Sequence, residues 1–447
     1  MRTDLRLALL LTRGSDRREW WRVTLTAVGA GLATGFMLAA AAVASLRGHY
    51  SVSIGNGLLN DPGERSGIVL ALLLLLVPVL GFLGQCARIG AVHRDRRLAG
   101  LRLAGAAPAQ VRRIAALETG LACLAGSSVA TVFSVLFVLG EWRNPPAAAW
   151  AAFASVAVAV PVLGALVSTL ALRRVVASPL GWVRRTRPST GRGPGTAFLT
   201  AAPVIMFVGL AMAPHQFGGF DTAPPLVFGV VIITSVGAVR ATAATARLTG
   251  RRLAARTGNP ATLIAAERLR DDPWAAARTH AAVLLVTVVG TGFIGIRQVL
   301  LDELNGRDRD SLAADISFYV TGVDLTGAAI LVALVITLSG LAVGTAESLA
   351  TRRRGLAAQA AAGVPHAVLG RALLLETALP LAPAVALAGA GGMAISTWYA
   401  WLAAGGSAVP LLPLLAPVAV YAACLLAAAT SLPLLRRSIH PTELRFT

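Results

Sequence analysis

The chain has 447 residues, of which 56% are hydrophobic and only 14% are charged, and its mean hydropathy is +0.70. Soluble domains carry about one charged residue in four, so this composition excludes an ordinary soluble enzyme or binding domain. The formal net charge is +19, and all 40 basic residues are arginine. We predict an all-α polytopic membrane protein.

Ten stretches are apolar and long enough to cross a bilayer as helices, which takes about 20 residues each. In chain order these spans are 23–45, 67–87, 115–139, 148–171, 196–213, 224–240, 281–299, 326–346, 372–395 and 409–434. Residues 1–22 contain six arginines and the pair Trp20-Trp21, which predicts an amphipathic surface helix with its tryptophans at headgroup level. Residues 251–280 are similarly rich in arginine and contain Trp274, which predicts a second surface helix.

Arginine is distributed unevenly across the predicted membrane. With the N-terminus inside, the inner segments hold 34 arginines and 11 acidic residues, whereas the outer segments hold 6 arginines and 10 acidic residues. This asymmetry follows the positive-inside rule. It predicts a multi-pass protein of the cell membrane with both termini in the cytoplasm. The basic charge then points to anionic lipid at the inner face and not to nucleic acid.

A segment of 26 residues occurs twice, as 94–119 and as 352–377. The aligned identities are all 258 positions apart, and they include Arg94 with Arg352, Arg96 with Arg354, Leu98 with Leu356, Gly105 with Gly363, Arg113 with Arg371, and Glu118 with Glu376. Internal repeats define the architecture of a chain. We therefore predict two parallel four-helix units at 23–172 and 281–447, joined by a connector at 173–250 that contains spans five and six.

Each copy is basic, helical and interrupted by one glycine, and two functions fit this pattern. The first is a helix that rests on the lipid surface. The second is a coupling helix that docks into a cytoplasmic partner and transmits force to the spans. Lipid anchoring alone does not require two copies with matched glycines and glutamates, so the pattern favours a coupling helix.

Glu118 and Glu376 each lie about one turn inside an apolar span, where ionisable groups are costly and often mark function. Each follows an arginine by five residues, Arg113 and Arg371 respectively. One hypothesis is a structural carboxylate at the membrane edge that reaches the interface or caps a neighbouring helix. The other is a proton or substrate site. We favour the structural role.

The repeated segment resembles the core motif of FtsX-like permeases, the membrane subunits of FtsX/MacB-type (type VII) ABC transporters. The first copy carries the resemblance through Arg96, Arg97, Leu98, Leu101, Gly105, Ala106, Arg113 and Glu118. The second copy departs from the motif at three places, where Gly355, Gln359 and Val364 stand.

The resemblance implies a permease that works with a separate cytoplasmic P-loop ATPase, in two copies, and transmits motion across the membrane or exports a lipid, peptide or antibiotic-like substrate. The residues expected to contact the ATPase are Arg96, Arg97, Leu98, Leu101, Leu103, Gly105, Ala106, Arg354, Leu356, Gly363 and Val364. The chain contains no G-x-x-x-x-G-K-[ST] stretch, so ATP would be bound by the partner.

No cofactor, metal site or catalytic set is expected in the chain itself, because its six histidines are scattered. The chain is therefore not predicted to be an enzyme. The alternative function is an ATPase-independent secondary transporter, or a scaffold or regulator of a cell-envelope partner.

Overall fold

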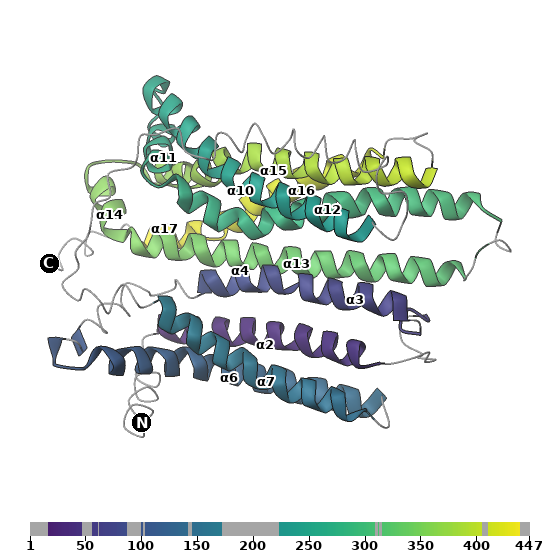
Figure 1. The fold of residues 1–447 in the computed structure, drawn as a ribbon. Coiled ribbons are helices and arrows are strands. Elements are labelled where there is room, and N and C mark those ends of the chain that lie inside the picture. The colour runs from purple at the N-terminus through teal and green to yellow at the C-terminus, as the bar shows by residue number, and fades with distance from the viewer. Residues whose placement is uncertain are drawn as a thin grey trace. The chain divides into compact units, whose positions relative to one another are not determined.

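The computed structural model describes residues 17–46, 56–60, 62–86, 100, 101, 103–141, 145–171, 223–308, 312, 315–404 and 410–438. These residues form helices joined by short turns, and no strand occurs among them. Eight of the helices are long and apolar enough to cross a membrane. The predicted class, an all-α polytopic membrane protein, is confirmed at this level (Figure 1).

The eight helices coincide with eight of the ten predicted spans. Their apolar segments are Trp20–Ser45, Ala109–Glu141, Ala147–Leu166, Gly229–Arg256, Thr279–Gly306, Ile316–Thr351, His366–Ala403 and Leu412–Leu435. Predicted span two contains a shorter apolar helix, Gly67–Leu80. Predicted span five, 196–213, lies outside the described residues, so the count of ten remains a prediction.

The chain divides into two compact units, Met1–Arg187 and Pro188–Thr447. The first contains α2 (Arg17–Ser45), α3 (Pro62–Leu74), α4 (Leu76–Cys86), α6 (Pro108–Glu141) and α7 (Ala147–Ala171). The second contains α10 (Ala223–Arg256), α11 (Pro260–Asp271), α12 (Pro273–Gly306), α13 (Ile316–Thr351), α14 (Arg353–Ala361), α15 (His366–Ala404), η3 (Leu412–Leu414), α16 (Leu415–Ala429) and α17 (Leu432–Ser438). Helix α10 packs against α12 and α15, so this part of the predicted connector belongs to the second unit.

In the first unit, α2 packs along α6 and α7, and α3 and α4 pack on α2 (Figure 1). The helices α2 and α6 approach closely at Gly126, where a Cβ atom would clash with the carbonyl oxygen of Ala27. Small residues allow this approach between membrane helices. Helices α3 and α4 are separated at Leu75, because Pro78 has no N–H to bond the carbonyl of Leu74.

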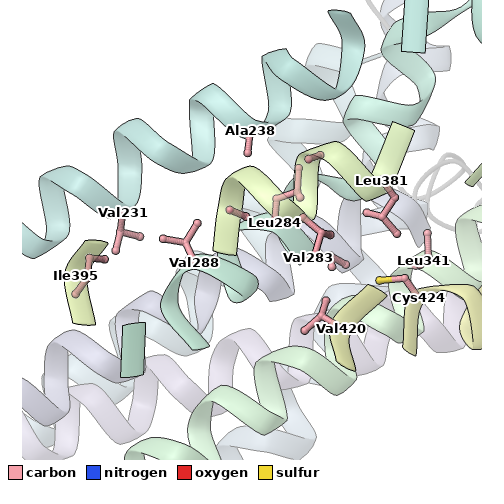
Figure 2. Close-up of a cluster of buried hydrophobic side chains, with 13 residues drawn as sticks. Val231, Ala238, Val283, Leu284, Val288, Leu341, Leu381, Ile395, Val420 and Cys424 are labelled. Atoms are coloured by element: carbon pink, nitrogen blue, oxygen red, sulfur yellow. The ribbon is translucent and has the colours of Figure 1, made fainter. Parts of the chain in front are cut away.

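In the second unit, α12 and α15 form the central pair, and α10, α13 and α16 pack around them. Figure 2 shows the core that they share, a cluster of buried aliphatic side chains that includes Val231 of α10, Leu284 of α12 and Leu381 of α15. Helix α10 has 34 residues, which corresponds to a length of about 50 Å. Since the hydrocarbon core is about 30 Å thick, α10 extends beyond it.

The predicted surface helix at 251–280 is divided into three parts: the end of α10, the short helix α11 and the start of α12. Two capping sequences explain the division. The side chain of Asn259 accepts a hydrogen bond from the N–H of Ala261, and that of Asp272 accepts one from Ala275. A proline follows each cap at the first helical position, where its missing N–H has no cost. Of the other predicted surface helix, 1–22, the structure describes only residues 17–22, which form the first turns of α2.

Candidate functional site

Where the structure describes both copies of the repeated segment, the turn at the glycine that they share has the same backbone conformation in each. In each copy a helical turn ends at a glycine, and a long span helix begins a few residues later, α6 in the first unit and α15 in the second. Gly105 has φ of 96° and Gly363 has φ of 91°. This left-handed conformation favours glycine, because a Cβ atom would clash with the backbone.

Matched hydrogen bonds close the two turns. The N–H of Ala106 donates to the carbonyl of Leu101 over 3.0 Å, and the N–H of Val364 donates to the carbonyl of Gln359 over 3.1 Å. A bond from the residue after the glycine to the carbonyl five positions earlier defines a Schellman cap. The described residues of the two copies therefore share one type of turn, each followed by a long helix.

Leu103 is the exposed apolar side chain of the first turn. It is 71% exposed, whereas Leu101 and Ala106 pack against the buried residues Val111 and Ala115 of α6. Three other predicted docking residues, Arg96, Arg97 and Leu98, lie outside the described residues. Among the described residues of this copy, Leu103 is a large apolar side chain that a partner protein can reach.

Leu356, predicted to be a docking residue in the second copy, is instead part of the core of its unit. It is 3% exposed and packs with Leu349, Leu369 and Leu435. Val364 lies at the edge of the same cluster. A partner cannot contact Leu356 in this conformation. The apolar face of α14 is covered by α13, α15 and α17 of its own unit, and the docking role of Leu356 stays a prediction.

Glu118 of α6 forms a buried ion pair with Arg22 of α2. The Nη2 atom of Arg22 donates to Oε1 of Glu118. The two side chains are only 6% and 4% exposed. This pair connects the start of the first span to the third span of the first unit.

Glu376 of α15 binds two arginines. Its Oε1 accepts from Nη1 of Arg268 in α11 over 2.6 Å, and its Oε2 accepts from Nη1 of Arg352, the residue before α14, over 2.9 Å. The three side chains are 13%, 22% and 36% exposed, in the order Glu376, Arg268, Arg352. In the second unit, Glu376 thus connects α15 to the short helix α11 and to Arg352, the first residue of the repeated segment.

Arg113 and Arg371, the arginines that precede these glutamates, are exposed and do not supply the ion pairs just described. Five residues in an α-helix correspond to a rotation of about 500°, or about 140° around the axis. The arginine and the glutamate of each copy therefore lie on different faces. The structural role that we favoured for Glu118 and Glu376 stays a prediction.

The sequence reasoning missed the actual partners Arg22, Arg268 and Arg352 as members of the site. A signal for them was present. Both predicted surface segments are rich in arginine, and Arg352 is the repeat partner of Arg94. The pairing itself depends on contacts between residues 96 and 108 positions apart.

No group of three or more His, Cys, Asp or Glu side chains within the described residues is placed to hold a metal ion. The three cysteines are buried thiols. A pocket bordered by Arg268, Leu349 and Leu356 is too small for an organic ligand.

No protein-family model matches the chain, and comparison with curated proteins gives no match. The resemblance to FtsX-like permeases therefore depends on the residues of the two copies themselves.

Proposed function

We propose that the chain is the permease subunit of an ABC transporter of the cell membrane, with both termini in the cytoplasm. A separate cytoplasmic P-loop ATPase would bind and hydrolyse ATP. The chain would convert ATPase movement into a conformational change across the membrane, either to act on a partner or to export a lipid, peptide or antibiotic-like substrate.

The observation that supports this proposal best is the duplicated Schellman turn at the start of a long, continuous helix. Helix α6 has 34 residues and α15 has 39, so their lengths are about 50 Å and 60 Å. A force applied at either turn would move a helix that is longer than the hydrocarbon core. Two equivalent turns also match a partner ATPase present in two copies.

The ion pairs of Glu118 and Glu376 would transmit the movement of the turns to other helices as well. Each glutamate lies in the helix that follows the turn and binds an arginine of an earlier helix of its unit, α2 or α11. Displacement of the turn would then also displace α2 in the first unit and α11 in the second. We assign to Glu118 and Glu376 the role of mechanical connections and not of substrate sites.

The first experiment is recovery of the tagged protein from its native membrane in mild detergent, with partner identification by mass spectrometry. The expected result is a P-loop ATPase at about two copies per chain. Recovery of no such ATPase, also after trapping with an ATP analogue, would contradict the proposal and favour a secondary transporter or scaffold.

A variant makes the experiment specific to the turns. Leu103→Asp combined with Ala361→Asp, the matching position of the second copy, places charge on both exposed turns. An anchor residue in an interface contributes about 2 kcal/mol, so ATPase recovery should fall at least about tenfold. Arg307→Asp is the control. Arg307 directly follows the C-terminal end of α12, away from both turns in the sequence, and its side chain is 62% exposed, so this change should leave ATPase recovery unchanged. Equal recovery of the ATPase with the double variant and with the control would contradict docking at the turns.

A further inference from the structure

The cluster of Arg268, Glu376 and Arg352 has an excess of positive charge. Each guanidinium donates one hydrogen bond to a different oxygen of the same carboxylate. The carboxylate balances one of the two arginines, so the cluster has a formal charge of +1. A second anion would neutralise this remaining positive charge.

The arginines of this cluster are its accessible members. A guanidinium has five N–H donors, and the bonds to Glu376 use one from each arginine. Arg268 and Arg352 are 22% and 36% exposed, compared with 13% for Glu376. The donors that remain can therefore reach a group outside the protein, and a guanidinium pair is well suited to the oxygens of a phosphate.

The corresponding pair of the first unit differs in this respect. Arg22 and Glu118 have side chains that are only 6% and 4% exposed. An external anion cannot reach them without separating α2 from α6. The first unit therefore provides an internal comparison in which the same type of carboxylate is closed to ligands.

The position of the cluster identifies the anion. Arg352 directly follows α13, and Glu376 lies about one turn inside the predicted span 372–395. Figure 1 shows α11 and α14 at the same end of the second unit. This is the level at which the apolar spans end and lipid phosphates begin. Because the neighbouring pocket is too small for an acyl chain, recognition would be confined to the headgroup.

We infer that Arg268 and Arg352 together bind the phosphate of an anionic phospholipid. Glu376 holds the two guanidiniums side by side and limits the affinity by its own charge. Lipid occupancy at this site would stabilise the contact between α11, α15 and the repeated segment of the second unit.

The test measures binding of a fluorescently labelled phosphatidylglycerol to the purified full chain in neutral detergent. Arg352→Gln and Arg268→Gln are each expected to weaken binding about fivefold, because an arginine near an anionic lipid surface contributes about 1 kcal/mol. Glu376→Gln is expected to strengthen binding, since it removes the competing carboxylate. A purely structural role for Glu376 would not give tighter binding.

Arg371→Gln is the matched control, because Arg371 is an exposed arginine on the same helix and its removal changes the net charge equally. It should leave the affinity unchanged, and an equal loss would show a diffuse surface effect and overturn the inference.

Competition experiments identify the ligand. Unlabelled phosphatidylcholine should not compete with the labelled phosphatidylglycerol. Displacement of the lipid by millimolar inorganic phosphate would assign the site to a soluble anion and overturn the lipid assignment. If Glu376→Gln does not fold, the lipid affinity of Arg352→Gln compared with that of Arg371→Gln still tests the inference. No ATPase is needed, so this outcome is separate from that of the proposed function.

Discussion

Gly105 and Gly363, 258 positions apart, have the same left-handed backbone conformation, with φ of 96° and 91°. The N–H of the following residue, Ala106 or Val364, bonds in each case to the carbonyl five positions earlier. The side chains around the two turns differ, since Leu101 of the first copy is replaced by Gln359 in the second. Both copies therefore form the turn at the glycine that they share, although the side chains around it differ.

Alanine at either glycine should destabilise the protein by about 1–2 kcal/mol, the cost of left-handed backbone for a residue with a Cβ atom. No atom lies within 4 Å of the added Cβ at Gly105 or Gly363, so the cost comes from backbone conformation. Thermal unfolding in detergent measures it. Gly100→Ala and Gly355→Ala are the controls, because both glycines are helical with open space around them. These should be neutral or stabilising by about 0.5–1 kcal/mol, and equal losses at all four positions would contradict the assignment.

Removal of one partner of the buried pair Arg22–Glu118 should cost about 3–5 kcal/mol, because the remaining charge is desolvated. We expect Arg22→Gln to lower the unfolding temperature more than any single change at Arg268 or Arg352. Those two arginines are partly exposed and share one carboxylate, and exposed ion pairs contribute about 0–1 kcal/mol.

A double-mutant cycle on Arg22→Gln and Glu118→Gln separates the pair energy from other effects of each change. A coupling energy above about 1 kcal/mol would agree with the buried pair. A cycle in which the two losses simply add would show that the pair contributes nothing to stability.

Gly126→Ala should separate α2 from α6. The added Cβ would clash with the carbonyl oxygen of Ala27 and lie 3.0 Å from the nitrogen of Gly31, and backbone atoms cannot rotate away. Forced overpacking typically costs about 1–3 kcal/mol. The control is Gly140→Ala on the same helix, which has nothing within 4 Å. Unfolding temperatures that match for the two variants would contradict the close approach.

The orientation of α12 can be measured by cysteine labelling. Gly258→Cys precedes α11 and Arg307→Cys follows α12, and both positions are exposed. The three native cysteines are buried, so background labelling should be low. A membrane-impermeant maleimide added outside intact cells should modify Arg307→Cys, and Gly258→Cys only after permeabilisation. Modification of both from outside would reverse the predicted topology.

The sequence by itself determined the features that depend on local chemistry. Long apolar segments predict spans because an unpaired backbone polar group is too costly in lipid. The glycine of each copy predicts a turn. The caps at Asn259-Pro260 and Asp272-Pro273 are equally local, but the sequence pattern predicted a single surface helix over 251–280.

Only the tertiary structure decided the partners of the two glutamates and the accessibility of the repeated helices. Glu118 pairs with Arg22 and not with the nearer Arg113, because helix rotation puts Arg113 on another face. Leu103 of the first copy is exposed while Leu356 of the second copy is buried, although the same docking role was predicted for both. Such differences depend on how helices pack against each other, and packing is set by the summed contacts of residues far apart in the chain.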